Sequence, residues 1–203
     1  PKDIIVVDCS KNFGVWTRFA VGLLVDTEYI CVFDDDTIPG SKWFENCLQS
    51  MSIREGLYGT IGVIFPEPRY SITLDNRVGW DRPNTEITEV DIVGHSWFFK
   101  REWLANLWRY TPNYNTDLKC GEDINFSFEL QKIGIPTLVP PHPPGEYELY
   151  GSNPETAWKY GADDNAVSRE VTSGVLFDNA LQEAIRKGFK LLCFKQSEGH
   201  HQS

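Results

Sequence analysis

The chain has 203 residues, a length that suits one folded domain and can bury a core without disulfides or metals. Hydrophobic residues make up 41% of the chain and charged residues 24%, values that exclude a collagen-like, disordered or coiled-coil protein. The 29 Asp and Glu residues outnumber the 19 Lys and Arg residues, and the net charge of −10 argues against a broad surface for the nucleic-acid backbone.

The first part of the chain alternates apolar strands with helices. Residues 4–7 form a β-branched run that predicts a buried strand, and residues 12–25 carry apolar side chains at helical spacing. Tyr29–Phe33 predicts a second buried strand, and residues 43–51 predict a second helix. This alternation of strands and helices predicts a parallel sheet, with ligand chemistry at the carboxyl ends of its strands.

Three more strands and three more helices are predicted after residue 56. The strands are expected at residues 57–65, 90–100 and 137–139. The helices are expected at residues 102–108, 121–133 and 181–192. Two turn-rich segments lie between these elements: residues 67–89, read as a loop with short strands, and residues 145–173, read as a mobile segment.

Three consecutive carboxylates directly follow the second predicted strand. Strand side chains alternate, so Asp34 and Asp36 share one face while Asp35 points away. Neighbouring carboxylates raise one another's pKa unless a cation joins them, and hard oxygen ligands suit Mg²⁺ or Mn²⁺ rather than zinc. A solvated acidic turn is the alternative. A metal site is favoured because the strand is apolar and ends where α/β sheets bind ligands.

A second acidic pair, Glu122 and Asp123, opens the helix predicted at residues 121–133. Carboxylates in a first helical turn complement the helix dipole and need no further role. Adjacent helical residues point about 100° apart, so at most one of the two faces a given site.

Four stretches occur in the order of a known family: IIVVDCS, KNFGVWTRFAVGLLVDTEYICVFDDD, VDIVGHSWFF and GEDINFSFELQKIGIP. Together they resemble the GT-A glycosyltransferases, above all the family-2-type group, and the GEDINF segment is also similar to exostosin-type enzymes. The resemblance covers residues 4–144. It implies an α/β fold of GT-A (Rossmann-like) type, a mixed, mainly parallel sheet flanked by helices. It also divides a single domain into a nucleotide-binding part (1–56), an acceptor and catalytic part (57–144), and a mobile loop with a C-terminal helix (145–203).

The resemblance implies a donor site in the first part of the chain. Asp8 would bind the nucleobase or ribose, and Arg18 would approach the nucleotide. Asp34 would meet the ribose, with Asp35 beside it in the nucleotide-binding set. Asp36 would be the main ligand of a metal ion, Mn²⁺ or Mg²⁺, that neutralises the donor diphosphate.

The resemblance also implies which residues act on the acceptor. Asp123 would be the base that takes the acceptor proton, with Glu122 as the second catalytic candidate. His95 and Trp97 lie where the family contacts acceptor sugars. The alternative is that both residues have an ordinary structural role. His142 follows the last predicted strand, where several family members place a further metal ligand. A plain loop histidine is its alternative.

The function implied is metal-dependent transfer of a hexose from a nucleotide-diphosphate sugar, with a UDP-sugar favoured, to a hydroxyl of a glycan or glycoconjugate. Inversion is favoured over retention. Residues 145–173, with Lys159 and Arg169, are expected to form a lid over the donor. Two other classes stay open: a non-catalytic module that binds a nucleotide sugar or glycan, and a nucleotidyltransferase. The latter normally has a Gly- and Lys/Arg-rich triphosphate loop near its start, which this sequence lacks.

One departure from the family concerns the beginning of the chain. The family has a strand and a helix before the segment that matches residues 4–7, whereas Pro1 stands almost directly before it. Either the chain is a fragment or its sheet is built differently, and in both cases a weaker nucleotide site is expected.

The cysteines and the apolar runs predict the compartment. Five scattered cysteines without a CxxC pair argue against a disulfide framework and a zinc ribbon, and favour a reducing compartment. No apolar run reaches the roughly 18 residues that span a bilayer, and no leader opens the chain. We therefore expect a cytoplasmic protein without a transmembrane segment.

Overall fold

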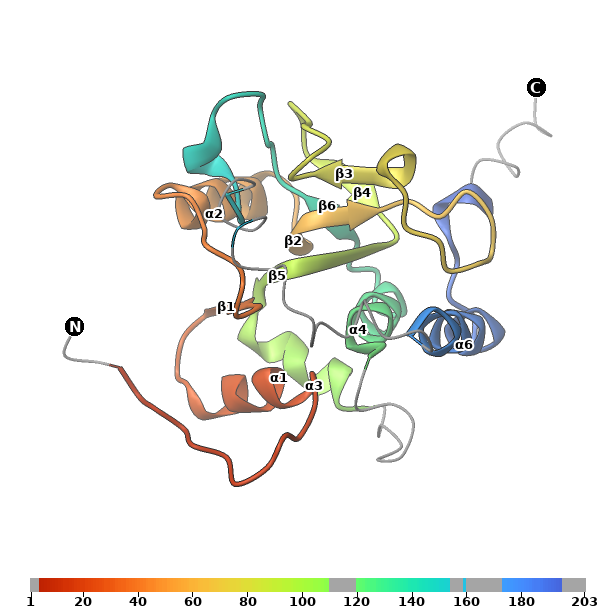
Figure 1. Cartoon of the computed structure of the whole chain (residues 1–203), viewed down its shortest axis with the longest axis horizontal. Helices are drawn as coiled ribbons and strands as arrows, with labels where there is room; N and C mark the ends of the chain where they lie inside the picture. Colours follow the sequence, from red (N-terminus) through yellow and green to blue (C-terminus); the bar gives the residue numbers. More distant parts are fainter. Residues whose placement is uncertain (1–3, 110–119, 154–158, 160–172, 195–203) are drawn as a thin grey trace.

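The computed structural model describes residues 4–109, 120–153, 159 and 173–194. These residues form an α/β structure in which helices flank a six-stranded mixed sheet (Figure 1). The strands are β1 (Tyr29–Phe33), β2 (Leu57–Val63), β3 (Arg77–Gly79), β4 (Thr88–Val90), β5 (Ile92–Lys100) and β6 (Thr137–Val139). The α-helices are α1 (Thr17–Val21), α2 (Trp43–Ile53), α3 (Leu104–Leu107), α4 (Glu122–Gln131) and α6 (Ser173–Arg186). The short 3₁₀ helices are η1 (Gly22–Leu24), η2 (Leu74–Asn76), η3 (Arg101–Trp103) and η4 (Tyr147–Leu149).

The strand order is β1-β5-β2-β6-β4, and β3 also pairs with β2. Among the described strands only β2 and β6 pair in parallel, and the other pairs are antiparallel. The prediction of a mainly parallel sheet was therefore wrong. The connection through α2 does make β1 and β2 run in the same direction, as a strand–helix–strand unit should. However, β5 returns between them and pairs antiparallel with both.

The prediction of a buried strand at residues 4–7 was also wrong. These residues lie outside the sheet, and Ile5 and Val6 are each 84% exposed. In Figure 1 the segment runs away from the sheet before the chain reaches α1. A β-branched run favours a strand because its side chains suit a pleated, half-buried surface, and here no neighbouring strand supplies that surface.

Several other predicted elements are confirmed, with shifted ends. β1 and β6 have the predicted bounds, and α2 is two residues longer than predicted. Short strands do occur in the turn-rich segment 67–89, with β3 in its middle and β4 at its end. The helix predicted at 12–25 begins only at Thr17, since Gly14 turns the chain at φ 79°. The helix predicted at 181–192 instead spans Ser173–Arg186 and stops before Gly188, which has φ 109°.

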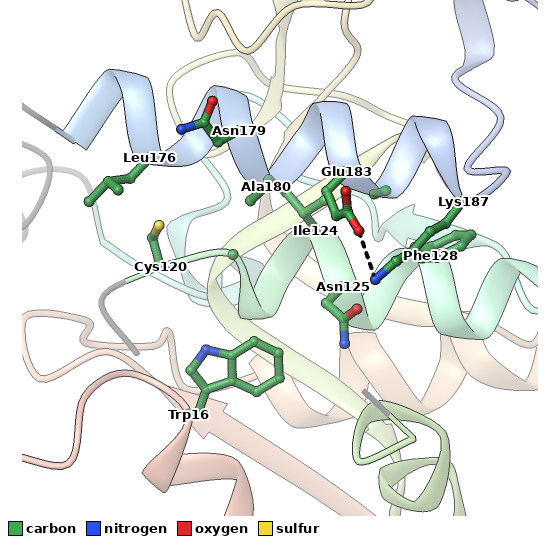
Figure 2. Close-up of a pocket in the computed structure, with 12 residues that line it drawn as sticks. Trp16, Cys120, Ile124, Asn125, Phe128, Leu176, Asn179, Ala180, Glu183 and Lys187 are labelled. Carbon is green, nitrogen blue, oxygen red and sulfur yellow. Dashed lines mark ion pairs between the residues drawn. The ribbon is translucent and has the colours of Figure 1, made fainter. Parts of the chain in front are cut away.

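The helices cover the sheet from two sides. Figure 1 shows α2 on one side of the sheet, and α1, α3 and α4 on the other, with α6 beside α4. Aromatic rings fill the α1–α4 side: Phe19, Phe99 and Phe126 are fully buried, and the Phe99 and Phe126 ring centroids lie 4.9 Å apart, edge to face. A second buried cluster joins α6 to α4 and the sheet through Leu181 and Ile124. A cavity remains between α4 and α6 (Figure 2).

Three further predictions concern the segment 145–173, the cysteines and the membrane. Most of the segment predicted to be a lid, with Arg169, lies outside the described residues. The five cysteines are all free. No helix in the described part of the chain is both long enough and apolar enough to cross a bilayer.

Candidate functional site

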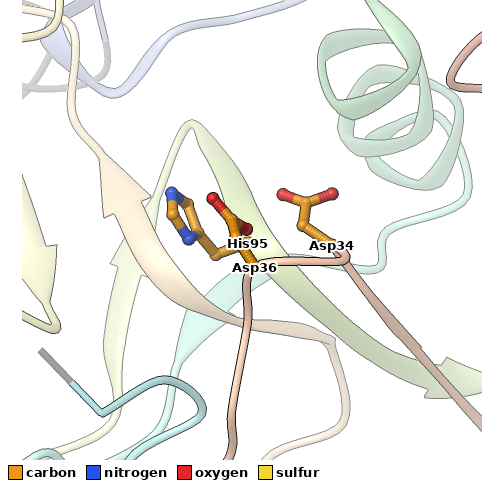
Figure 3. Close-up of side chains that lie close together, drawn as sticks. All are labelled: Asp34, Asp36 and His95. Atoms are coloured by element: carbon orange, nitrogen blue, oxygen red, sulfur yellow. The ribbon is translucent and has the colours of Figure 1, made fainter. Parts of the chain in front are cut away.

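Asp34, Asp36 and His95 come together beyond the end of β1 (Figure 3). One ligand atom from each residue can be chosen so that all of them lie within 4.8 Å of one another. Asp36 Oδ1 and His95 Nδ1 are buried and have no hydrogen-bond partner. Because a buried polar atom without a partner costs free energy, this arrangement suits a bound cation.

A β-bulge aims His95 at the carboxylates. Gly59 of β2 lies opposite Trp97 of β5, whereas Ile61 lies opposite Gly94, so β5 contains one extra residue at this point. His95 has φ 65°, a left-handed conformation that residues other than glycine seldom adopt. Its ring stacks on Trp80, with centroids 5.7 Å apart.

The bulge is tied to the acidic loop by the His95 carbonyl oxygen. This oxygen accepts hydrogen bonds from Asp34 N at 3.1 Å and from Thr37 Oγ1 at 3.0 Å. The two sides of the candidate metal site are therefore held together by the backbone as well as by the sheet.

Arg18 of α1 joins this group to the acidic pair on α4. Its Nη1 donates to Asp34 Oδ1, and its Nη2 donates to Glu122 Oε1 at 2.5 Å. The guanidinium carbon lies 4.5 Å from the centroid of the Trp97 ring. Trp97, which was predicted to face an acceptor sugar, is only 2% exposed and supports Arg18 from within the core.

The two acids open α4 behind Gly121, which has φ 86°. Glu122 is 6% exposed, and burial raises the pKa of its carboxyl, with the neighbouring Asp123 charge adding to the rise and Arg18 opposing it. Burial also raises the pKa of Asp123, whose Oδ1 accepts a hydrogen bond from Ile124 N at 2.7 Å. Both acids therefore hold their protons to a higher pH than an exposed carboxyl does.

Tyr70 is a neighbour of the acidic pair that the sequence did not single out. Burial raises the pKa of its phenol, and the charges of Asp123 and Glu122 raise it further. The ring stacks on Phe177 of α6, with centroids 4.9 Å apart and an interplanar angle of 12°. Tyr70 is half-buried and lies in the turn-rich segment 67–89, where no periodicity marks it in the sequence.

The remaining candidates lie outside the group of Asp34, Asp36 and His95. Asp35 is exposed, as its predicted orientation required. Asp8 is exposed on the segment that leaves the sheet, so the predicted strand does not hold it beside the nucleotide.

His142 is fully buried and is likewise not part of the group. Its Nδ1 lies 2.8 Å from the Pro140 carbonyl oxygen, and its ring packs edge to face on Tyr150, with centroids 4.8 Å apart. Burial lowers its pKa to about 4. The ring that the structure brings to the carboxylates is that of His95, which had been predicted to meet the acceptor.

The donor set of two carboxylates and one imidazole fits a divalent cation. Carboxylate oxygens suit Mg²⁺ and Mn²⁺, whereas imidazole is a ligand for first-row transition ions. Asp34 has a pKa raised by burial, with Arg18 and His95 lowering it, which is the behaviour of a carboxylate that needs positive charge nearby.

Comparison with known proteins gives no family for the chain: no family model matches it, and no curated protein is significantly similar to it.

Proposed function

We propose that the chain is a metal-dependent glycosyltransferase that moves a sugar from a nucleotide-diphosphate donor, preferably a UDP-sugar, to a hydroxyl acceptor. The observation that carries the proposal is the double contact of Arg18 with Asp34 and Glu122. Through it, Glu122 is joined to the candidate cation site, and the neighbouring Asp123 adds a second acid with a raised pKa at the start of α4. Transfer from a nucleotide sugar needs both: positive charge for the leaving diphosphate and a base for the acceptor.

The residues that would hold the ion are Asp34, Asp36 and His95. A bound Mn²⁺ would supply positive charge that stabilises the diphosphate as it leaves. An imidazole among the ligands favours Mn²⁺ over Mg²⁺, which prefers oxygen ligands alone. Arg18 holds Asp34 and Glu122 in place, so it acts as a positioning residue for both groups.

Asp123 is the proposed general base. Its Oδ1 is bonded to the backbone of α4, so its other oxygen, Oδ2, would receive the acceptor proton. The acceptor oxygen then forms a bond to the anomeric carbon, the bond from that carbon to the diphosphate oxygen breaks, and the proton ends on Asp123. A raised pKa brings this carboxylate closer to the operating pH and makes it a stronger base. Attack from the side opposite the diphosphate inverts the anomeric centre.

A non-catalytic module that binds a nucleotide sugar is the second candidate. It is favoured by the exposed position of Asp8, which leaves the proposed nucleotide pocket without one of its predicted contacts.

The first prediction concerns the cation. Mn²⁺ with UDP should raise the melting temperature of the wild type, and a ligand at a hundredfold excess over its Kd stabilises the fold by about 2.7 kcal/mol. Asp36→Asn should lose most of this shift, as should His95→Gln. Asp35→Asn is the matched control, since it removes the same charge from the next residue, which is exposed. Equal shifts in Asp36→Asn and Asp35→Asn would exclude the site.

The second prediction concerns turnover, measured as UDP released from a panel of UDP-sugars with Mn²⁺ and simple acceptors. Asp123→Asn should lower the rate by roughly 10² to 10⁴, the usual contribution of a positioned base, while UDP binding survives. Glu122→Gln should cost less. NMR of the product should give an inverted anomeric centre. Metal-dependent binding without any release would favour the non-catalytic module, and full activity of Asp123→Asn would remove this residue from the mechanism.

A further inference from the structure

The cavity between α4 and α6 is separate from the group of Asp34, Asp36 and His95. Its volume is about 230 Å³, and Trp16, the residue before α1, closes it on one side (Figure 2). From α4 come residues at helical spacing, among them Ile124 and Phe128, and from α6 come Leu176 and Ala180. From α6 the small side chains of Ala180 and Ala184 line the cavity, opposite Ile124 and Phe128 of α4.

The walls formed by the described residues favour a neutral ligand over a charged one. The charged residues that line the cavity, Glu183 and Lys187, form an ion pair of 3.1 Å with each other. The amides of Asn125 and Asn179 supply polarity, and Asn125 Nδ2 is already directed at the Leu107 carbonyl oxygen at 3.4 Å. The other walls are apolar or aromatic, so a neutral, largely apolar group is the matching ligand.

The volume restricts that group to about one ring. A cavity of about 150 Å³ lined by apolar side chains holds benzene, whereas pockets for whole drug-sized ligands start at about 300 Å³. The present cavity, at about 230 Å³, lies between these sizes. Aromatic rings prefer offset or edge contacts with other rings, and Trp16 and Phe128 offer such surfaces.

The cavity is lined by the two residues that flank the proposed catalytic acids in the chain. Gly121 and Ile124 line it, whereas Glu122 and Asp123, which stand between them, are not among its lining residues. We infer that the cavity binds an aromatic ring and, resting on the proposed function, that this ring is the apolar part of the acceptor. Bound there, the ring would hold the acceptor beside the first turn of α4, with its sugar or hydroxyl directed at the acids.

Fluorobenzene tests the cavity by ¹⁹F NMR titration of the intact chain, without metal or nucleotide. Ala180→Phe, which fills the cavity, should weaken binding at least about tenfold, a loss of about 1.4 kcal/mol. Val175→Phe is the control, because it adds the same ring to α6 at a residue that is 63% exposed and does not line the cavity. If circular dichroism shows that Ala180→Phe does not fold, Leu176→Trp replaces it. No binding to the wild type, or equal binding to the filled variant, overturns the inference.

The assignment to the acceptor is tested in the same titration. Phenyl glycosides should displace fluorobenzene from the wild type, whereas methyl glycosides of the same sugars should not. Failure of every phenyl glycoside to displace the probe overturns the assignment. Because these measurements need neither Mn²⁺ nor a donor, they stand even where UDP release is absent, so a failed cavity and a failed transferase give different results.

Discussion

Arg18 is the residue on which the charge balance of the site depends. It contacts the carboxylates of Asp34, on the loop that follows β1, and of Glu122, on α4. Its side chain is 26% exposed, so water screens its charge only partly. Asp34, Glu122 and Asp123 together carry more negative charge than one guanidinium balances. Burial is the main reason why the pKa values of all three are raised, and neighbouring carboxylates raise them further: Asp36 and Asp35 act on Asp34, and Asp34 acts on Glu122 and Asp123.

At this scale a pH dependence of stability is predicted. A carboxyl with a raised folded-state pKa keeps its proton where the unfolded chain has lost it, so its stabilisation is present at low pH. It is lost as pH rises above the ordinary value of 4.5. The free energy of unfolding should therefore decline with rising pH by up to about 1.4 kcal/mol per pH unit for each proton held only by the folded state.

Urea unfolding measured from about pH 5 to about pH 8 checks this. Glu122→Gln should flatten the decline, since it removes one titrating group and relieves Asp123. Glu45→Gln, at an exposed position on α2, changes the formal charge equally and should leave the slope as in the wild type. Parallel curves for the wild type and Glu122→Gln would show that this acid titrates normally.

Among the secondary-structure elements, β5 and its bulge decide the geometry of the site. The extra residue in β5 places His95 in a left-handed conformation that costs roughly 1–2 kcal/mol for an L-residue. Glycine adopts this conformation without strain.

A prediction about variants at residue 95 follows from that conformation. His95→Gly and His95→Ala both lose the stack on Trp80, but the glycine variant should be more stable than the alanine variant by roughly 1 kcal/mol. The neighbouring Ser96 is also in the bulge but does not have a positive φ, and both of its variants lose the same hydrogen bond to Thr60 Oγ1. There the order should reverse, with Ser96→Ala more stable than Ser96→Gly. Chemical denaturation of the four variants gives the order of their stabilities at each position. If His95→Ala is more stable than His95→Gly, the left-handed backbone at residue 95 is contradicted.

The bulge also shows where prediction from the sequence ended. Asp34 and Asp36 do lie together with Asp35 outside, as alternation predicted. However, β1 ends at Phe33, and the arrangement comes from a turn that Thr37 N closes by donating to the Asp34 carbonyl oxygen. The pairing of His95 with Asp34 and Asp36 depends on a register between β2 and β5 that no local pattern encodes. His142, the histidine chosen from its place after the last strand, instead became a core residue held by the Pro140 carbonyl oxygen.

At the scale of the whole molecule, individual elements could be predicted from local patterns, but their neighbours in the sheet could not. The apolar patterns at β1, α2 and β6 identified each element, since each pattern reports which face of its own element is buried. They did not report which strands would be neighbours. That β5 returns between β1 and β2 depends on pairs such as Tyr29 with Lys100, which lie far apart in the chain.

At the same scale, α6 should contribute to global stability. Leu181 is fully buried in the cluster that joins α6 to α4 and the sheet. Leu181→Ala should lower the free energy of unfolding by about 2–5 kcal/mol, through lost burial and the space left behind. Val175→Ala, on an exposed part of the same helix, should cost far less. Equal small effects in urea unfolding would mean that α6 is not part of the cooperative fold.

The position of β6 has a consequence for the order in which the protein can fold. β6 lies between β2 and β4 in the sheet, yet Thr137–Val139 leaves the ribosome long after both of them. Until it emerges, Leu57 and Tyr58 lack one backbone partner strand and β4 lacks the strand it pairs with. Contacts between such distant residues slow folding, and an unfinished strand edge can pair with another chain. Synthesis that stalls before residue 137 would therefore release an incomplete sheet prone to aggregation.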